Sequence, residues 1–159
     1  MRSNCILLRG DPIYAEASAT AEILPGMLVS VNGAFRTVSS NPTVSPATAG
    51  QTVTSFAREN EVMGLGIEDA YAEDDNVLIM SNRSGDVVQA WLAAGQNIEA
   101  GAELGSVGGG LLGAAVPGSQ DESTPFAVTF PAPVLARALE TINNSGGGAV
   151  AVRINVEVV

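Results

Sequence analysis

The chain has 159 residues, a length that suits one domain whose core needs no metal or disulfide. The formal net charge is −10, and the seven basic residues are all arginines spread along the chain, so nucleic-acid binding is not expected. Lysine and histidine are absent, which excludes Ser-His and Cys-His nucleophiles, Schiff-base and P-loop lysines, and histidine metal ligands.

Hydrophobic residues make up 46% of the chain and charged residues only 15%, which favours a surface that partly meets other protein. Cys5 is the single cysteine and is expected to be a small buried hydrophobe, so a reducing compartment is acceptable. The apolar run from Cys5 to Leu8 is too short for a signal peptide, and no stretch reaches the roughly 18 apolar residues of a membrane span. We therefore expect a soluble protein made in a cytoplasm.

The first forty residues carry three strand signals. Ile6 to Leu8 is a short apolar run, and the Arg9-Gly10-Asp11 that follows is interpreted as a turn before Pro12 rather than as an integrin motif. Further on, Met27 to Val31 predicts a strand, Asn32-Gly33 a hairpin turn, and Ala34 to Val38 the return strand.

Two quartets of aliphatic residues and glycines match at one constant offset: Ile23, Gly26, Val29 and Gly33 with Ile98, Gly101, Leu104 and Gly108. The match is either a chance similarity or one Ile-x-x-Gly corner that the chain uses twice. The second interpretation predicts a pseudo-symmetric barrel or sandwich.

Residues 39–55 are rich in Ser, Thr, Pro and Ala and carry no charge. Such a composition does not favour a packed element, and its lack of charge is also atypical of solvated disorder. We interpret residues 39–55, and the N-terminal segment 1–14, as extensions that become ordered against a partner.

A run of acidic residues follows in the next segment: Glu68, Asp69, Glu73, Asp74 and Asp75. Their spacing does not fit an EF-hand calcium loop, and nothing fixes the separation that a glycosidase carboxylate pair would need. A solvated acidic loop is the favoured interpretation. Residues 107–113 are rich in glycine, but no lysine follows them as in a phosphate-binding loop. We interpret residues 107–113 and 117–121 as flexible joints.

The central stretch, Gly64 to Leu112, holds two apolar runs separated by a polar turn. Val77 to Met80 and Val87 to Leu92 predict two strands that pair as a hairpin. After them, Gly95 and Gly101 flank one buried-looking isoleucine, Ile98, which predicts a tight corner.

Three elements are predicted after residue 120. Residues 125–130 alternate like a half-buried strand, and Val134 to Asn143 predicts one short α-helix that Pro133 opens. The last segment, Ala149 to Val159, predicts a strand with valines and Ile154 on one face and Arg153, Asn155 and Glu157 on the other.

Together these elements predict a mainly-β fold over residues 1–159: a single domain, either a small β-barrel or a β-sandwich, with one short α-helix near the C-terminus and extended arms. No catalytic, cofactor-binding or metal-binding set of residues emerges from the sequence. The chain is therefore expected to be a non-enzymatic, associating protein.

Two resemblances go further. Gly85 to Gly101 resembles the hairpin of lipoyl and biotinyl carrier domains, but those domains need a lysine at the tip, so their function does not transfer.

Over nearly the whole length, the order of features is similar to the head decoration or cement proteins of tailed bacteriophages. The features are Ile23 to Gly26, Gly66 to Tyr71, Gly85 to Val87, Ala94 to Gln96, Gly101 to Leu104, Ala136 to Glu140 and the valine-rich C-terminal strand.

The resemblance implies a structural virion protein that binds the outer surface of an assembled capsid and stabilises contacts between major capsid proteins of an HK97-like shell, commonly as a homotrimer. A net negative charge agrees with a position away from packaged DNA. The alternative is a virion surface module that binds a host glycan or receptor, with the acidic run or Trp91 and Tyr71 as a sugar platform.

Overall fold

The structure is a computed structural model, and it describes residues 5–32, 42–115, 133–146 and 149–159. Within these ranges the chain forms thirteen β-strands and one 3-10 turn, η1 (Glu61–Met63). The strands are β1 (Leu7–Arg9), β2 (Ile13–Ala19), β3 (Val29–Asn32), β4 (Thr43–Pro46), β5 (Ser55–Ala57), β6 (Asn76–Ser81), β7 (Val87–Leu92), β8 (Gln96–Ile98), β9 (Glu103–Gly108), β10 (Leu111–Ala114), β11 (Ala136–Ala138), β12 (Ile142–Asn144) and β13 (Val152–Val158).

The mainly-β class is confirmed, whereas the predicted helix at Val134 to Asn143 is wrong. That segment forms β11 and most of β12 instead. Ala136 and Ala138 are buried on one face of β11, between β9 and β13, while Leu139 is exposed. Pairing on both sides of the strand thus outweighs the local helix propensity of alanine and leucine.

The first half of the chain forms a five-stranded sheet in the order β3-β4-β2-β6-β5. All its pairs are antiparallel except β2 with β4. An isolated bridge between Leu28 and Phe56 joins the chain just before β3 to β5, at the other edge of the sheet.

The second half forms a six-stranded sheet in the order β1-β7-β10-β9-β11-β13, and β13 pairs again with β7. These pairings make a circuit of five strands. However, β7 and β10 share a single residue pair, Leu92 with Leu112, so the circuit is not a closed barrel. A separate pair of short strands, β8 and β12, lies beside it.

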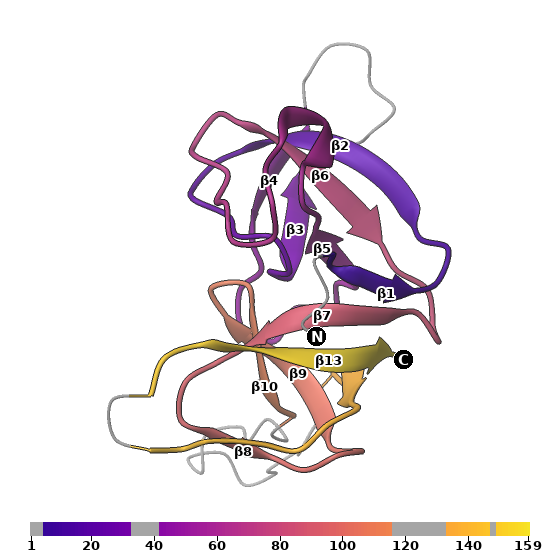
Figure 1. The fold of residues 1–159 in the computed structure, drawn as a ribbon, viewed down its shortest axis with the longest axis vertical. Coiled ribbons are helices and arrows are strands. Elements are labelled where there is room, and N and C mark those ends of the chain that lie inside the picture. The colour runs from indigo at the N-terminus through magenta and orange to yellow at the C-terminus, as the bar shows by residue number, and fades with distance from the viewer. Residues whose placement is uncertain (1–4, 33–41, 116–132, 147–148) are drawn as a thin grey trace, which may run out of the picture.

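The two halves repeat one arrangement. The order β3-β4-β2-β6-β5 corresponds, strand by strand and in chain order, to β9-β10-β7-β13-β11. Shifting both numbers of the Ile13–Ser81 pair in β2–β6 by 75 gives the Val88–Val156 pair in β7–β13. The first half lies in the upper part of Figure 1 and the second half in the lower part.

The repeated corner seen in the sequence belongs to this arrangement. Ile23 and Ile98 are both buried, and Gly26 and Gly101 both have a φ of 87°. An L-residue rarely adopts that φ, so glycine at both corners is a backbone requirement. The similarity is therefore a structural repeat and not a chance match.

The hairpin predicted between Val77 to Met80 and Val87 to Leu92 is wrong, although both strands exist as β6 and β7. Strand β6 pairs with β2 and β5, whereas β7 pairs with β1, β10 and β13. The connection between them passes from one half to the other. The buried Asp86 holds this turn, where it accepts hydrogen bonds from the Arg83 and Asp11 backbone N–H groups.

The described parts of the two expected extensions, residues 42–55 and 5–14, form strands of the sheets. Residues 42–55 contain β4 and the first residue of β5, with Val44 and Ala47 buried. Residues 5–14 contain β1 and the start of β2, with Ile6 buried. The return strand at 34–38, the strand at 125–130 and the joint at 117–121 lie outside the described residues.

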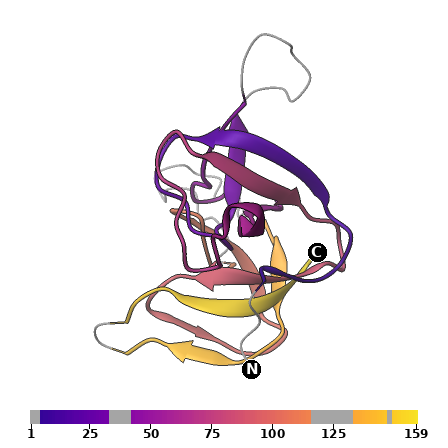
Figure 2. The ribbon, with the colours of Figure 1, turned by 45° about the horizontal axis from the view of Figure 1, so that its top comes forward.

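The two halves share part of their core. One buried cluster lies within the first half and includes Val29, Tyr71 and Ile79. The other fills the second half and continues into the first through residues such as Phe56 and Met80. Strand β1 belongs to the N-terminal end of the chain but pairs with β7, so it runs alongside the second half (Figures 1 and 2).

Candidate functional sites

A cavity of about 620 Å³ lies over the outer face of β7 and β13. We call it the β7–β13 cavity. The alternation of the two strands turns residues such as Ala90 and Ile154 into the core. Gln89, Trp91, Arg153 and Asn155 lie on the opposite face. The lining residues are Leu8, Ile67, Glu68, Gln89, Trp91, Glu140, Ile142, Ala151, Val152, Arg153 and Asn155.

Arg153 fixes one wall of this cavity. Its Nη1 donates to the Pro25 carbonyl at 3.0 Å, its Nη2 donates to the Ile67 carbonyl, and its Nε donates to Glu68 at 3.2 Å. Its guanidinium carbon lies 4.3 Å from the centre of the Trp91 ring. Burial lowers the pKa of the Arg153 guanidinium, and the charge of Glu68 opposes this effect. Arg153 therefore ties β13 to two backbone carbonyls of the first half.

Two side-chain amides form the neighbouring wall. Gln89 and Asn155 are directly opposite each other in the β7–β13 register. Gln89 is only 9% exposed, and neither Gln89 Oε1 nor Asn155 Oδ1 accepts a hydrogen bond from the described part of the chain. Glu140 lies beside them, and its Oε1 accepts the Asn155 backbone N–H at 2.7 Å. The wall thus carries buried acceptors whose hydrogen-bonding capacity is unmet.

The repeat places a second depression at the equivalent position in the first half. Glu16 and Leu78 are opposite each other on β2 and β6, and a shift of 75 converts them into Trp91 and Arg153. Depressions of about 390 and 190 Å³ both touch Glu16 and Leu78. We call this surface the η1 groove; it is lined by Tyr14, Ala15, Glu16, Arg58, Asn60, Val62, Met63, Leu65, Tyr71, Asp75, Asn76, Leu78 and Ile79.

The η1 groove has an apolar rim. Val62 and Met63 are 92% and 73% exposed, and Tyr14 is about half exposed with Arg58 5.4 Å from its ring centre. Exposed apolar side chains that gather in this way are typical of protein-binding surfaces. The two equivalent surfaces therefore differ in character: one has an exposed apolar rim, and the other combines amides and charged groups with apolar side chains.

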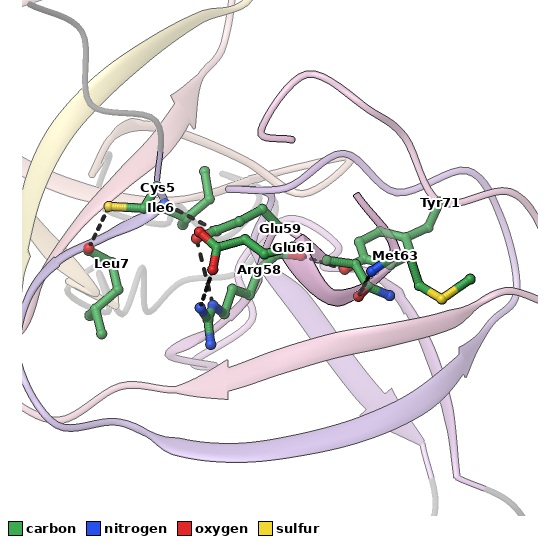
Figure 3. Close-up of polar contacts among 9 residues, drawn as sticks. Cys5, Ile6, Leu7, Arg58, Glu59, Glu61, Met63 and Tyr71 are labelled. Atoms are coloured by element: carbon green, nitrogen blue, oxygen red, sulfur yellow. Dashed lines mark hydrogen bonds and ion pairs between the residues drawn. The ribbon is translucent and has the colours of Figure 1, made fainter. Parts of the chain in front are cut away.

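A buried carboxylate, that of Glu59, lies beside Arg58, which lines the η1 groove (Figure 3). Glu59 is 1% exposed, its Oε2 accepts the Ile6 backbone N–H at 3.1 Å, and its Oε1 lies 3.6 Å from Arg58 Nε. Arg58 also reaches Glu61, with 3.6 Å between Nη2 and Oε2. Cys5, next to Ile6, is half-buried, and its Sγ donates to the Leu7 carbonyl at 3.2 Å. Glu59 thus fastens the residues before β1 to the first half.

The structure separates the residues proposed for a sugar platform. Tyr71 is buried, and its hydroxyl donates to the Arg58 carbonyl at 2.6 Å. Burial raises the pKa of Tyr71 to about 12. Trp91 lines the β7–β13 cavity, and its Nε1 donates to the Pro25 carbonyl at 2.9 Å. Tyr71 lies at the η1 groove and Trp91 at the β7–β13 cavity, so the two rings do not form one platform.

The acidic run is exposed, and two of its five side chains hold turns. Asp69 accepts the Gly66 N–H and Asp75 accepts the Ala72 N–H, each at 2.7 Å. Glu68 differs, because it pairs with Arg153. Among the described residues no group of three or more metal-ligand side chains gathers, and no helix in those ranges is long and apolar enough to cross a membrane.

Only part of the cavity lining could be predicted from the sequence. The alternation of residues 149–159 placed Arg153 and Asn155 on one polar face, which was the available signal. Gln89 gave none, because it lies inside an apolar run, and Glu140 was assigned to a helix. Their proximity depends on the β7–β13 register.

No family model matches the chain, and no curated protein sequence matches it. Among solved structures, the fold is similar to the head fiber gp8.5 N base of bacteriophage phi29, with a TM-score of 0.53. The similarity covers 92% of this chain and 93% of the phi29 chain, at 13% sequence identity.

Proposed function

We propose that the chain is a structural, non-enzymatic protein of a tailed-phage virion that lies on the outer surface of the head and stabilises contacts between major capsid proteins. The observation that carries the proposal is the fold shared with the phi29 head fiber base over nearly the full length of both chains. The order of sequence features that resembles head decoration proteins supports it independently of the fold.

The η1 groove is the surface that we propose for the contact with the shell. It combines exposed Val62 and Met63 with Tyr14, the last residue of the N-terminal segment expected to meet a partner. Burying such side chains against a partner contributes roughly 25 cal/mol per Å² of apolar surface, before the entropy of association is subtracted. The low share of charged residues, 15%, agrees with a surface that meets protein.

Co-sedimentation with empty capsids from the phage that encodes the chain tests the proposal. We expect the purified protein to sediment with the capsids and the double variant Val62→Asp/Met63→Asp to sediment much less. Val150→Asp is the matched control, because Val150 is also an exposed valine but lies in the second half. Wild-type protein that stays in the supernatant would contradict capsid binding, and equal loss in both variants would contradict the η1 groove. Deleting residues 39–55 is a poor test, because it removes β4.

The proposed assembly on the shell is a homotrimer. Multi-angle light scattering of the purified chain tests this state, and a strict monomer at high concentration would contradict it.

A second candidate function, a virion module that binds a host glycan or receptor, is favoured by the β7–β13 cavity. Its lining places one aromatic residue, Trp91, beside hydrogen-bonding side chains.

A further inference from the structure

We propose that the β7–β13 cavity is a binding site for a neutral saccharide, held by the amides of Gln89 and Asn155 with Glu140 and Trp91 beside them. The site goes beyond the capsid-binding role, because it lies in the second half, on the surface equivalent to the η1 groove and not on the groove itself. Binding is a property of the chain alone and needs no capsid.

The first argument is the pair of unmet acceptors. Gln89 is nine-tenths buried and lines the cavity, yet its Oε1 receives no hydrogen bond from any described residue, and the same is true of Asn155 Oδ1. Leaving a buried acceptor unpaired costs about 1–3 kcal/mol. Less than 1 Å² of each oxygen is exposed, so a turn of each side-chain amide must accompany binding. Hydroxyl donors of a ligand would then satisfy both oxygens, and the amide nitrogens could donate to the ligand's oxygens.

The second argument is charge. Glu68 and Glu140 both line the cavity, so an anionic ligand such as a phosphate or a sialylated glycan would meet two carboxylates. A cationic ligand would approach the Arg153 guanidinium. Both carboxylates are also engaged, Glu68 by Arg153 and Glu140 by the Asn155 backbone N–H. The groups left to pair are neutral amides, which suit the hydroxyls of a neutral sugar.

The third argument is size and rigidity. A volume of about 620 Å³ lies within the usual range of small-molecule sites, roughly 300–1,000 Å³. The wall that faces the ligand is held in place, because Arg153 donates to the Pro25 and Ile67 carbonyls and Trp91 Nε1 also donates to Pro25. Little ordering would accompany binding, which favours affinity.

The chain offers a built-in reporter for the test, because Trp91 is its only tryptophan. Full-length protein is titrated with maltose, lactose, cellobiose and N,N′-diacetylchitobiose, and Trp91 fluorescence and titration calorimetry are both recorded. A glycan array that carries neutral and sialylated glycans widens the panel. The proposal expects saturable binding of at least one neutral saccharide by both readouts.

The double variant Gln89→Leu/Asn155→Leu removes both amides and fills the space with side chains of similar size. Replacing an unpaired polar pair by apolar groups is close to neutral for stability. We expect its affinity to fall about tenfold or more, which corresponds to about 1.4 kcal/mol. If the double variant does not fold, Gln89→Leu alone replaces it. Asn97→Leu, an exposed amide on β8, is the matched control and should bind like wild type.

Three results would overturn the proposal. The first is that no neutral saccharide binds in the titrations or on the array. The second is that saccharide binding survives the Gln89 and Asn155 substitutions. The third is that sialylated glycans, or a short Lys/Arg-containing peptide used as a competitor, bind this cavity in preference to neutral saccharides. None of these results depends on capsid co-sedimentation, so the two proposals fail separately.

Discussion

Trp91 and Arg153 are opposite each other on antiparallel strands β7 and β13, and the Arg153 guanidinium carbon lies 4.3 Å from the centre of the Trp91 ring. The same guanidinium donates to the Pro25 and Ile67 carbonyls of the first half. One side chain thus joins a cation–π contact within the second half to hydrogen bonds between the halves.

Replacing Arg153 by alanine should lower the free energy of unfolding by about 3 kcal/mol, because it leaves two backbone carbonyls without their charged donor and removes the cation–π contact. Urea unfolding followed by Trp91 fluorescence measures the change. Arg137→Ala is the control: Arg137 is exposed and pairs with Glu103 at 3.6 Å, so its loss should change stability by less than about 1 kcal/mol. Equal effects of the two substitutions would show that the contacts of Arg153 with the first half add little to stability.

The repeated corner gives a matched pair of glycine substitutions. Gly26 and Gly101 share a φ of 87°, but a Cβ at Gly26 would lie 2.7 Å from the Gln89 carbonyl oxygen, whereas a Cβ at Gly101 meets nothing within 4 Å. Gly101→Ala should therefore cost only about 1–2 kcal/mol for the backbone conformation. Gly26→Ala should cost clearly more, because a backbone atom must also move. Thermal unfolding of both variants tests the order, and a greater loss in Gly101→Ala would contradict it.

The buried carboxylate of Glu59 should stabilise the N-terminal strand. Glu59→Ala leaves the Ile6 N–H without its acceptor in the core, and we expect a loss of about 1–3 kcal/mol. Hydrogen exchange should show faster exchange of the β1 amides. Glu61→Ala is the control, because Glu61 is exposed and should contribute little. Unchanged exchange in β1 would argue against this anchoring role.

Stability should fall in alkaline solution because of Tyr71. Its pKa in the folded state, about 12, lies above the ordinary value of 10.0, so the unfolded chain loses this proton first as the pH rises. The contribution is complete below pH 10 and is lost between about pH 10 and pH 12, at most about 2.7 kcal/mol for a difference of two units.

Tyr71→Phe should remove most of that alkaline loss and should cost about 1 kcal/mol at neutral pH, where the hydrogen bond to the Arg58 carbonyl is missing. Tyr14→Phe, at the exposed second tyrosine, should leave the alkaline decline unchanged. Urea unfolding from pH 7 to pH 12 measures both variants. A decline that persists in Tyr71→Phe would assign it to other groups.

The sequence predicts where strands lie better than it predicts which strands pair. Residues of β6, β7 and β13 were identified because their apolar runs or alternation are local signals. The partner of β6 was not, because Ile79 pairs with Ala15 and Ala57, which are distant in sequence, while the nearby β7 belongs to the other half. Turn residues between β6 and β7 look the same in a hairpin and in a crossing between halves.

The helix error and the missed cavity have related causes. Leu135 and Leu139 have helical spacing, but the residues between them form β11, because they pair with β9 and β13. Leu135, just before the strand, is buried, and Leu139, just after it, is exposed. Likewise, Gln89 and Asn155 meet only through the register of two strands that are far apart in the chain. Pairing between distant strands determines both the fold of residues 136–138 and the contact between Gln89 and Asn155. A local sequence pattern carries no information about such pairing.

The crossing of β1 to the second half has a consequence for the order in which the chain folds during synthesis. The strands of the first half are complete at Ser81, and domains generally fold as their residues leave the ribosome. Strand β1 is made before all of them, but its partner, β7, begins only at Val87. We therefore expect β1, although it is made before the other described strands of the first half, to take its place only after they have folded, when Glu59 is already positioned to receive Ile6.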